Sequence, residues 1–446
     1  MPEEAISAAD LVRAIQTPTA RGIAADVTAM VQRGELLAGT RLPTVRAVAA
    51  ELAVSPATVV NAWSLLQRRR VIATFGRRGA FVSGLPAVSR PTRFDRVGNF
   101  GRRLTVDLTE LAPDPALLPD LRPAFAAALD DGISTGYGDD PITPRLRDAV
   151  AANWPFAAQD WSAVNGGYEA LHLLAQTTIG PGDAVAVEEP TAARLLDIIE
   201  SLGGQALPVI CDQAGPLPAS LAAALSRTPV AFIFQPRGQS PAGHYLTPER
   251  CAQLAAMLRR SSAIVIEDDG APELSCVPAV SIGSHLPDRT VLVRSFSKSH
   301  GPDLRLAVVG GGSEIVSRLV TLRTYGARWT SRILQDAAAF LLTDETSRRV
   351  VALARDTYAA RRTTLAEALA DRGIRTGNRD GLALWVPVED ERHALVTCAA
   401  HGIATSPGSR FCTSKIGDHL RVSPTRLADG VDFVAEVLTM AAHADL

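Results

Sequence analysis

Short apolar runs alternate with longer amphipathic stretches through most of the chain after residue 105. Four of these runs are continuous and only four or five residues long: 184–187, 230–234, 263–266 and 290–293. A strand without a polar face is buried on both sides, as in parallel sheets that are covered by helices. The alternation of such strands with helical segments predicts an α/β body with a mainly parallel central sheet.

The first 84 residues follow a different pattern. Helical spacing of apolar positions runs from residue 7 to residue 33, and Pro18 interrupts it, which predicts two helices or one kinked helix. Thr44 has the place of an N-cap for the next helix, and Ser55 followed by proline marks the start of another. Two short apolar strands, 71–75 and 80–82, enclose a turn with two arginines. This order of helix, turn, helix and basic hairpin predicts a winged helix-turn-helix.

The distribution of charge also changes after residue 84. Residues 1–84 hold ten arginines and six acidic residues, a net charge of +4, whereas the whole chain of 446 residues carries −2. A basic module on an acidic body indicates an anionic partner at the basic end. The sequence has no apolar run of membrane-spanning length and no signal-peptide core, so we expect a cytoplasmic protein without a membrane partner. The five cysteines lack metal-site spacing and are interpreted as small buried side chains.

Lysine is almost absent from the chain, where Lys298 and Lys415 are the only two. A lysine amine can lose its proton and attack an aldehyde, which arginine cannot do. Lys298 follows the apolar run 290–293, with Ser295 nearby and with Arg305 placed to offer a bidentate phosphate contact. The alternative interpretation is a surface lysine in a loop rich in serine and glycine.

The segment 295–305 resembles the cofactor-lysine segment of the fold-type I pyridoxal 5'-phosphate (PLP) enzymes, the aspartate aminotransferase superfamily. The resemblance implies that Lys298 forms the internal aldimine with PLP and that Ser295 and Arg305 bind the phosphate. The segments 137–147, 164–171, 235–243, 266–269 and 419–423 resemble the superfamily in the same order along the chain. They imply that Asp268 contacts the pyridine nitrogen of the cofactor and that Arg421 contacts the carboxylate of an effector. The further cofactor-binding residues that they imply are Tyr137, Gly166, Gly167, Tyr168, Ser240 and Asp268. The alternatives are a loop acid for Asp268 and a surface ion pair for Arg421.

Three positions depart from the superfamily pattern. Relatives carry a ring-stacking aromatic residue where this chain has Ala192, an asparagine where it has Ser240 and a tyrosine where it has Gly270. In the superfamily, the asparagine and the tyrosine donate hydrogen bonds to the ring hydroxyl. The anchoring residues therefore persist while the tuning residues are missing, which favours a cofactor used for sensing over one used for rapid turnover.

The basic module resembles the GntR family of bacterial repressors in the segments 34–36, 39–46 and 55–59. The resemblance implies that the second helix of the motif contacts the operator and that the wing reaches the minor groove. The implied DNA-binding residues are Arg41, Arg46, Ser55, Thr58, Asn61, Arg77, Arg78 and Gly79. Pro56 stands where the family has arginine, so we expect an operator that differs from the usual half-site. The alternative is a small helical protein-interaction domain.

A GntR-like head joined to an aminotransferase-like body resembles the MocR subfamily of bacterial transcriptional regulators. The resemblance implies a multidomain fold, with an α+β winged helix-turn-helix (1–84), a linker (85–105) and an α/β PLP-dependent transferase fold (106–446). The last would consist of a large PLP-binding part (106–345) and a small C-terminal α/β part (346–446).

The same resemblance implies a homodimer that binds operator DNA and senses an amino acid or amine through PLP. Such a regulator works in the bacterial cytoplasm and is associated with the nucleoid when it is bound to DNA. Two alternatives stay open: a working aminotransferase with an appended DNA-binding head, and a regulator whose body has lost PLP. We expect sensing rather than catalysis, with residual transaminase activity left open.

Overall fold

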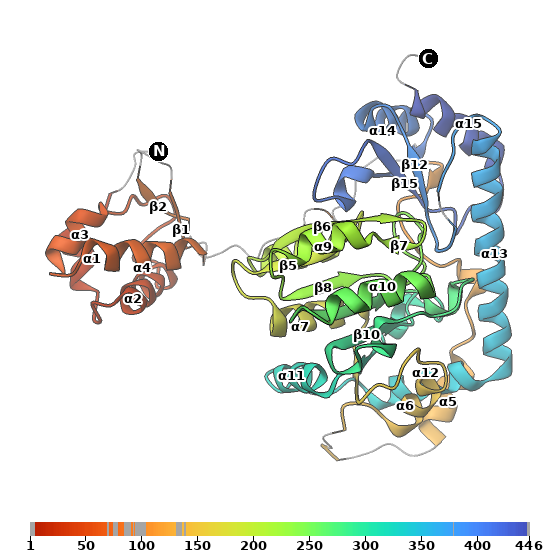
Figure 1. Ribbon diagram of the computed structural model, residues 1–446, viewed down its shortest axis with the longest axis horizontal. Coiled ribbons are helices and arrows are strands. Elements are labelled where there is room, and N and C mark those ends of the chain that lie inside the picture. The colour runs from red at the N-terminus through yellow and green to blue at the C-terminus, as the bar shows by residue number, and fades with distance from the viewer. Residues whose placement is uncertain are drawn as a thin grey trace. The chain divides into compact units, whose positions relative to one another are not determined.

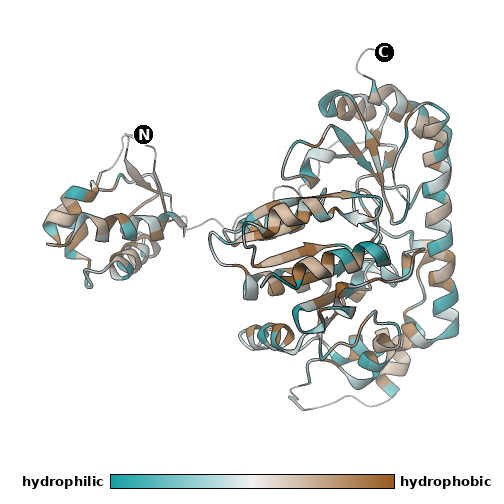
Figure 2. Ribbon diagram, in the orientation of Figure 1, coloured by the Kyte–Doolittle hydropathy of each residue, from teal (hydrophilic) through white to brown (hydrophobic). Residues whose placement is uncertain are grey.

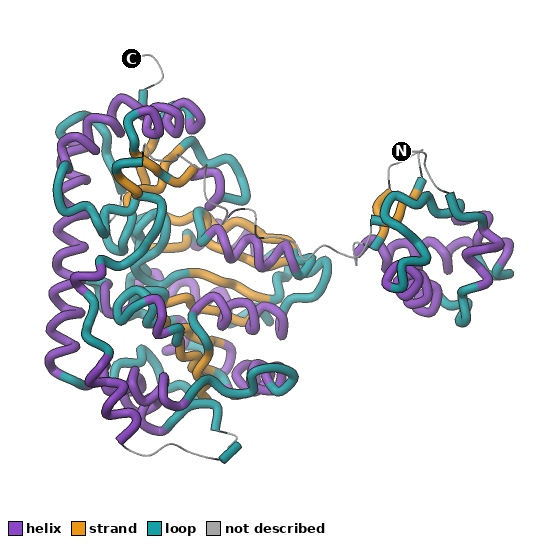
Figure 3. The backbone as a smooth tube through the Cα atoms, turned by 180° about the vertical axis from the view of Figure 1, so that it is seen from behind, coloured by secondary structure: helices purple, strands orange, loops and turns teal. Residues whose placement is uncertain are grey.

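The computed structural model describes residues 5–68, 71–74, 79–83, 91, 93, 104–130, 136–137, 140–377 and 379–443, apart from the side chains of Gln32 and Arg68. The chain divides into two compact units, Met1–Pro91 and Thr92–Leu446. Figure 1 shows the elements of each unit, and Figure 3 shows the strands of the larger unit enclosed by helices. Among the described residues, no helix is both long enough and apolar enough to cross a bilayer.

The smaller unit, here called the head, has four helices and a two-stranded hairpin among its described residues. They are α1 (Ala8–Arg13), α2 (Ala20–Gln32), α3 (Val45–Glu51), α4 (Pro56–Arg68), β1 (Ile72–Thr74) and β2 (Ala80–Val82). The side-chain oxygens of Ser7, Thr19 and Thr44 cap the first three helices by accepting backbone hydrogen bonds. Pro18 lies between two separate helices, so the two-helix alternative is the one that forms.

The core of the head forms where the apolar faces of its helices meet the hairpin. Val48, Val59, Trp63 and Leu66 are all buried there. The hairpin strands are antiparallel, with Ile72 opposite Val82. The winged helix-turn-helix that the pattern predicts is therefore confirmed.

The larger unit, here called the body, is built on an eight-stranded sheet with the order β4-β11-β10-β9-β8-β5-β6-β7. The strands are β4 (Asp160–Val164), β5 (Ala184–Glu189), β6 (Gln205–Asp212), β7 (Gly215–Pro216), β8 (Ala231–Phe234), β9 (Ile264–Asp269), β10 (Thr290–Ser295) and β11 (Ala307–Gly311). The five neighbours from β10 to β6 are parallel, while β11 and β7 are antiparallel to the strands beside them. Figure 2 shows these strands as largely hydrophobic ribbons, as the apolar runs predict.

Helices cover both faces of the sheet, because alternate side chains of each buried strand point to opposite faces. On one face, Val293 packs with α7, α8 and α11; on the other, Leu292 packs with α12, and Phe232 packs with α9 and α10. The helices of this layer arrangement are α5 (Arg122–Asp130), α6 (Pro144–Ala151), α7 (Gly167–Thr178), α8 (Ala193–Ser201), α9 (Pro218–Leu225), α10 (Pro248–Leu258), α11 (Ser313–Arg323) and α12 (Arg332–Thr343). Short 3-10 turns connect them: η4 (Pro115–Leu117), η5 (Pro272–Leu274), η6 (Ile282–Ser284), η7 (Pro287–Arg289) and η8 (Pro302–Leu304).

The C-terminal part of the body has its own sheet and core. Its elements are β12 (Leu384–Pro387), α14 (Glu391–Ala400), β13 (Ile403–Ala404), β14 (Ser406–Pro407), η9 (Gly408–Phe411), β15 (His419–Val422) and α15 (Val431–Ala442). The antiparallel order is β12-β15-β14. The first strand of the body, β3 (Val106–Asp107), pairs with β13 and so belongs to this part, which the sequence pattern does not show.

A 26-residue helix, α13 (Glu345–Ala370), runs along the body and joins its two parts (Figure 1). Its middle turns are bonded on two sides. Asp114 accepts an ion pair from Arg361 at 2.9 Å, and its backbone N–H donates to the hydroxyl of Tyr358 at 2.8 Å. The buried guanidinium of Arg362 donates to the carbonyl of Gly381.

Candidate functional site

Lys298 lies just beyond the end of β10, as its sequence position predicts. A side chain at Gly270 would place its Cβ 3.5 Å from the Lys298 Nζ atom and 3.7 Å from Asp268 Oδ1, so the amine and the carboxylate face one small space. Burial lowers the pKa of Lys298, and the negative charge of Asp268 opposes that shift. Burial likewise raises the pKa of Asp268 to about 7, with Lys298 opposing. Each shift reflects the cost of burying a charge, which the opposite charge of the partner partly offsets.

Two glycines at the start of α7 form one wall of a small anion cradle. A Cβ at Gly166 would lie 3.0 Å from Arg305 Nη2, and a Cβ at Gly167 would lie 3.2 Å from the Cβ of Ser295. Gly166 has φ 102° and ψ 163°, a conformation essentially reserved for glycine, and no side chain caps the helix. Free N–H groups at a helix start, a hydroxyl and a guanidinium together suit a phosphate.

Arg421 projects from β15 with part of its guanidinium unsatisfied. Its Nη2 atom donates to the Ser406 hydroxyl at 3.2 Å and to the Thr109 carbonyl, and the group lies 4.7 Å from the ring centroid of Phe411. Its Nε atom is buried without a hydrogen-bond partner. Burial lowers the pKa of Arg421 to about 10. A buried N–H of this kind is costly when left unpaired, so the site suits an anionic ligand.

Tyr168 lies between these two regions and has an unforeseen neighbour. The Arg194 guanidinium, at the start of α8, is 4.5 Å from the centroid of its ring. Burial raises the pKa of the Tyr168 hydroxyl, and the Asp268 carboxylate adds to that shift while Arg194 and Arg421 oppose it. Ala192 stands where relatives have an aromatic residue, and Arg194, two residues later, contacts the Tyr168 ring without any signal in the sequence pattern.

The other cofactor residues that the sequence predicts are placed differently. Ser240 is buried, and its backbone N–H and carbonyl are bonded to the side chain of Gln235 at 3.2 and 3.1 Å. Tyr137 is 84% exposed, and its described ring contact is edge-to-face with Trp329, at 5.8 Å between centroids. Within one chain, then, the described contacts of Tyr137 do not join it to the anion cradle.

Of the predicted DNA-binding residues that the structure describes, Arg46 lies on α3 and Thr58 and Asn61 lie on α4, while Arg41, Ser55 and Gly79 lie in the segments before α3, α4 and β2. Arg46 and Asn61 are exposed, whereas Thr58 is half-buried and its hydroxyl is 2.8 Å from that of Ser55. Ser55 also accepts from the Thr58 N–H at 3.1 Å, so it caps α4. Arg41 is exposed, and its guanidinium would lie 3.6 Å from a Cβ at Gly79, beside the start of β2. Arg77 and Arg78 lie outside the described residues.

Comparisons with known proteins agree with both halves of this description. The family model of aminotransferase class I and II matches residues 105–438, and that of the bacterial regulatory proteins of the gntR family matches residues 19–82. The vitamin B6 salvage pathway transcriptional repressor PtsJ of Salmonella typhimurium is 33% identical over 435 residues, which cover 96% of this chain and 98% of that protein. The chain belongs to the MocR-type GntR regulators.

More distant relatives of this MocR-type regulator extend the comparison. The pyridoxine biosynthesis transcriptional regulator PdxR of Corynebacterium glutamicum is 27% identical over 77% of each chain. The regulator TauR of Rhodobacter capsulatus is 26% identical over 86% of this chain and 88% of its own. Among solved structures, Pyrococcus horikoshii kynurenine aminotransferase has a TM-score of 0.67 at 22% identity, covering 75% of this chain and 91% of that one, which shows the fold of the body.

The predicted fold class and cofactor are thus confirmed: a GntR head precedes a fold-type I body, and the regulator is PLP-dependent. The residues present also fit PLP on structural grounds. At Gly166, the Arg305 guanidinium lies where a Cβ would crowd it, so the absence of a side chain brings this cation next to the backbone at the start of α7, as a phosphate site requires. The Lys298 amine and the Asp268 carboxylate, which face one small space, have the chemistry to anchor the aldehyde and the pyridine nitrogen of the cofactor.

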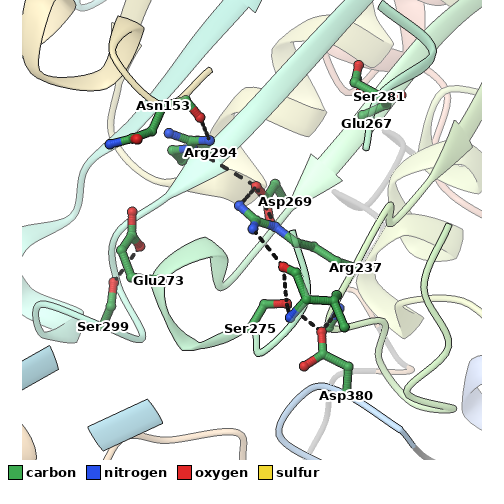
Figure 4. A network of polar contacts seen from close by, with 12 residues as sticks. Asn153, Arg237, Glu267, Asp269, Glu273, Ser275, Ser281, Arg294, Ser299 and Asp380 are labelled. Carbon is green, nitrogen blue, oxygen red and sulfur yellow. Dashed lines mark hydrogen bonds and ion pairs between the residues drawn. The ribbon is translucent and has the colours of Figure 1, made fainter. Parts of the chain in front are cut away.

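A buried ionic network supports the loops that carry these anchors (Figure 4). Asp269, next to Asp268, pairs with Arg237 at 2.8 Å and lies 4.0 Å from the Nε atom of Arg294. Ser299, next to Lys298, donates to Glu273 at 3.0 Å. Neither the pairing of Asp269 nor that of Glu273 was apparent from sequence. These contacts hold the side chains of Asp269 and Ser299, the chain neighbours of Asp268 and Lys298.

The same network reaches the C-terminal part through Asp380 (Figure 4). The fully buried Asp380 carboxylate accepts hydrogen bonds from the Gly238 N–H at 2.9 Å, the Ser275 hydroxyl at 2.5 Å and the Cys276 N–H at 3.0 Å. A Cβ at Gly381 would lie only 3.0 Å from the carbonyl oxygen of Gly238. The loop before β12 is therefore fastened to the loops around the cofactor site.

Proposed function

We propose that the body of this regulator senses an amino acid or amine at the PLP site and passes the signal to the DNA-binding head. One observation carries the proposal: the anchors are assembled while a tuning group is missing beside them. Lys298 and Asp268 share a space in which Gly270 contributes no side chain. One position that carries a tuning residue in catalytic relatives thus lacks a side chain, while the residues that we propose to hold the cofactor are in place.

When bound, PLP supplies an aldehyde that reacts reversibly with amines and an electron-accepting ring. The chain's own residues prepare for amine exchange. Because burial lowers the pKa of Lys298, more of its amine is neutral at a given pH, and the neutral form is the nucleophile. Gly270 places no hydroxyl of its own beside the Lys298 amine, so a group that could steer proton transfer is missing at that position.

Arg421 gives the proposed sensor a way to recognise a carboxylate. Its buried Nε atom has no partner, and a bidentate carboxylate would satisfy it together with a second guanidinium N–H. We therefore expect α-amino acids to act at lower concentration than simple amines of the same size.

The test uses full-length, PLP-loaded protein with an operator selected from random duplexes. Candidate amino acids and matched amines are added while the visible cofactor spectrum and operator affinity are recorded together. Spectral change with altered operator affinity, and no sustained keto-acid product, supports sensing. Arg421→Gln should remove the advantage of amino acids over amines, whereas substitution of the exposed Arg13, on α1, should leave it. Spectral change that never alters operator affinity would contradict the proposal.

A second candidate signal is PLP itself. It is favoured by two relatives that are named for vitamin B6 salvage repression and for pyridoxine biosynthesis regulation. Comparing operator affinity of the cofactor-free and PLP-loaded chains, without amino acids, separates the two candidates. A large change on PLP addition alone, with none from amines, favours PLP as the signal. Turnover of an amino acid and a keto acid on the order of 1 per second or faster would favour an aminotransferase.

We also propose that the regulator acts as a homodimer in the cytoplasm and on the nucleoid. Tyr137 supports this: its cofactor role is implied by resemblance, yet its ring is 84% exposed within one chain. An exposed tyrosine can serve the cofactor of a second copy. Light scattering should give twice the chain mass, and Tyr137→Phe should weaken PLP binding without monomerising the protein.

A further inference from the structure

The solvent-facing side of α4 in the head has an unusual chemical character. Val59, Ala62, Trp63 and Leu66 form the buried side of this helix. Ala57, Val60 and Asn61 follow at helical spacing on the other side, and all three are exposed, with Val60 at 48%. The exposed side thus presents two apolar side chains next to a single amide.

This exposed side lacks the groups with which proteins usually read guanine. From Pro56 to Gln67 the helix carries no charged residue, and guanine is recognised chiefly by arginine or lysine in the major groove. The Thr58 hydroxyl, which could also contact a base, is already paired with that of Ser55 at 2.8 Å. Asn61 therefore remains as the exposed hydrogen-bonding side chain of the first two turns.

Positive charge lies on the neighbouring elements instead. Arg46 on α3 and Arg41 before it are both exposed. In a winged helix-turn-helix, the second helix enters the major groove while flanking basic residues hold the phosphates. An uncharged face framed by arginines suits base edges rather than the DNA backbone.

We propose that α4 reads A·T base pairs, with Val60 and Ala57 against thymine methyl groups and Asn61 bonded to an adjacent adenine. The proposal rests on the DNA-binding function of the head and adds the chemistry of the operator. Apolar side chains match the thymine C5-methyl, and an amide can bond in a bidentate manner to adenine N6 and N7. Val60 and Asn61 are consecutive, so the two contacts fall on neighbouring base pairs.

The test replaces thymine by deoxyuracil, one position at a time, in the operator selected with full-length, PLP-loaded protein. This change removes only the methyl group. Burying one methyl group corresponds to about a fourfold change in affinity, so one or two positions in each half-site should weaken binding by about that factor. The half-site itself should be rich in A·T pairs where α4 docks.

Variants then assign the effect to side chains. Val60→Ala should bind thymine and deoxyuracil equally at one of the methyl-sensitive positions, whereas Leu37→Ala, which truncates another exposed apolar residue of the head, should keep the difference at all of them. Asn61→Ala should lose discrimination between adenine and 7-deazaadenine. Tight binding with no sensitivity to any thymine methyl would overturn the inference, as would a Val60→Ala protein that still discriminates at every methyl-sensitive position. Failure of the protein to select any duplex would overturn the DNA-binding function itself.

Discussion

Gly166→Ala is the sharpest test of the phosphate cradle. The added methyl group would stand 3.0 Å from Arg305 Nη2 and 3.2 Å from its Cζ atom, closer than ordinary contact allows. Arg305 would have to move away from the start of α7. We therefore expect the variant to keep its fold and to lose affinity for PLP.

The size of the loss follows from the interaction removed. A hydrogen bond between a charged donor and a phosphate contributes about 1.5–3 kcal/mol, so PLP affinity should fall about tenfold to a hundredfold. Alanine at the backbone angles of Gly166 also costs about 1–3 kcal/mol of folding stability. The loss of folding stability says nothing about the cradle, so it has to be measured separately from the loss of PLP affinity.

Gly182→Ala supplies the matched control. Gly182 has a similar positive φ of 90°, but a Cβ there would meet nothing within 4 Å. Both variants should therefore melt earlier than the unmodified chain, while only Gly166→Ala should bind PLP more weakly. Absorbance titration of the cofactor-free proteins measures the affinity, and calorimetry measures the stability. Equal loss of PLP affinity in both variants, or in neither, would refute the reasoning.

Three further outcomes are expected. Borohydride reduction should fix a pyridoxyl mass on the peptide that contains Lys298. Lys298→Arg should abolish this label, whereas Lys415→Arg, which replaces an exposed amine, should leave it. A label on any other peptide would count against Lys298. Burial raises the pKa of Glu267 from 4.5 to about 8, so its carboxyl costs stability as pH rises through that window. Glu267→Gln should therefore stabilise the body by on the order of 3 kcal/mol more at about pH 8.5 than at about pH 5, and an equal effect at both would contradict this. Arg46→Ala should weaken operator binding and lower its salt slope by about one, whereas an unchanged slope would exclude a phosphate contact.

Local pattern was sufficient to predict much of the body. The apolar run 290–293 becomes the buried strand β10, and Lys298 lies just past its end. The glycines at 166 and 167 open α7, as a strand, a turn and a helix in succession imply. These features depend on residues close together in the chain, which is why sequence reasoning reaches them.

Features that depend on distant segments were missed. The pairing of Arg237 with Asp269 joins residues 32 apart, and β3 meets β13 across nearly the whole body. An isolated charge in a sequence does not reveal its partner. Val60 was missed for a different reason: at helical spacing, an apolar residue is normally assigned to the core, and only the packed structure shows it facing solvent.

The long helix α13 gives the body a mechanical property. A rod of 26 residues is about 39 Å long, and it is held near its midpoint by the bonds from Tyr358, Arg361 and Arg362. If the helix tilts as a rigid rod about these bonds, its two ends move in opposite directions. A tilt of about 5° about that pivot carries each tip through nearly 2 Å in opposite senses. Motion that begins beside α12 would therefore emerge, reversed, beside α15.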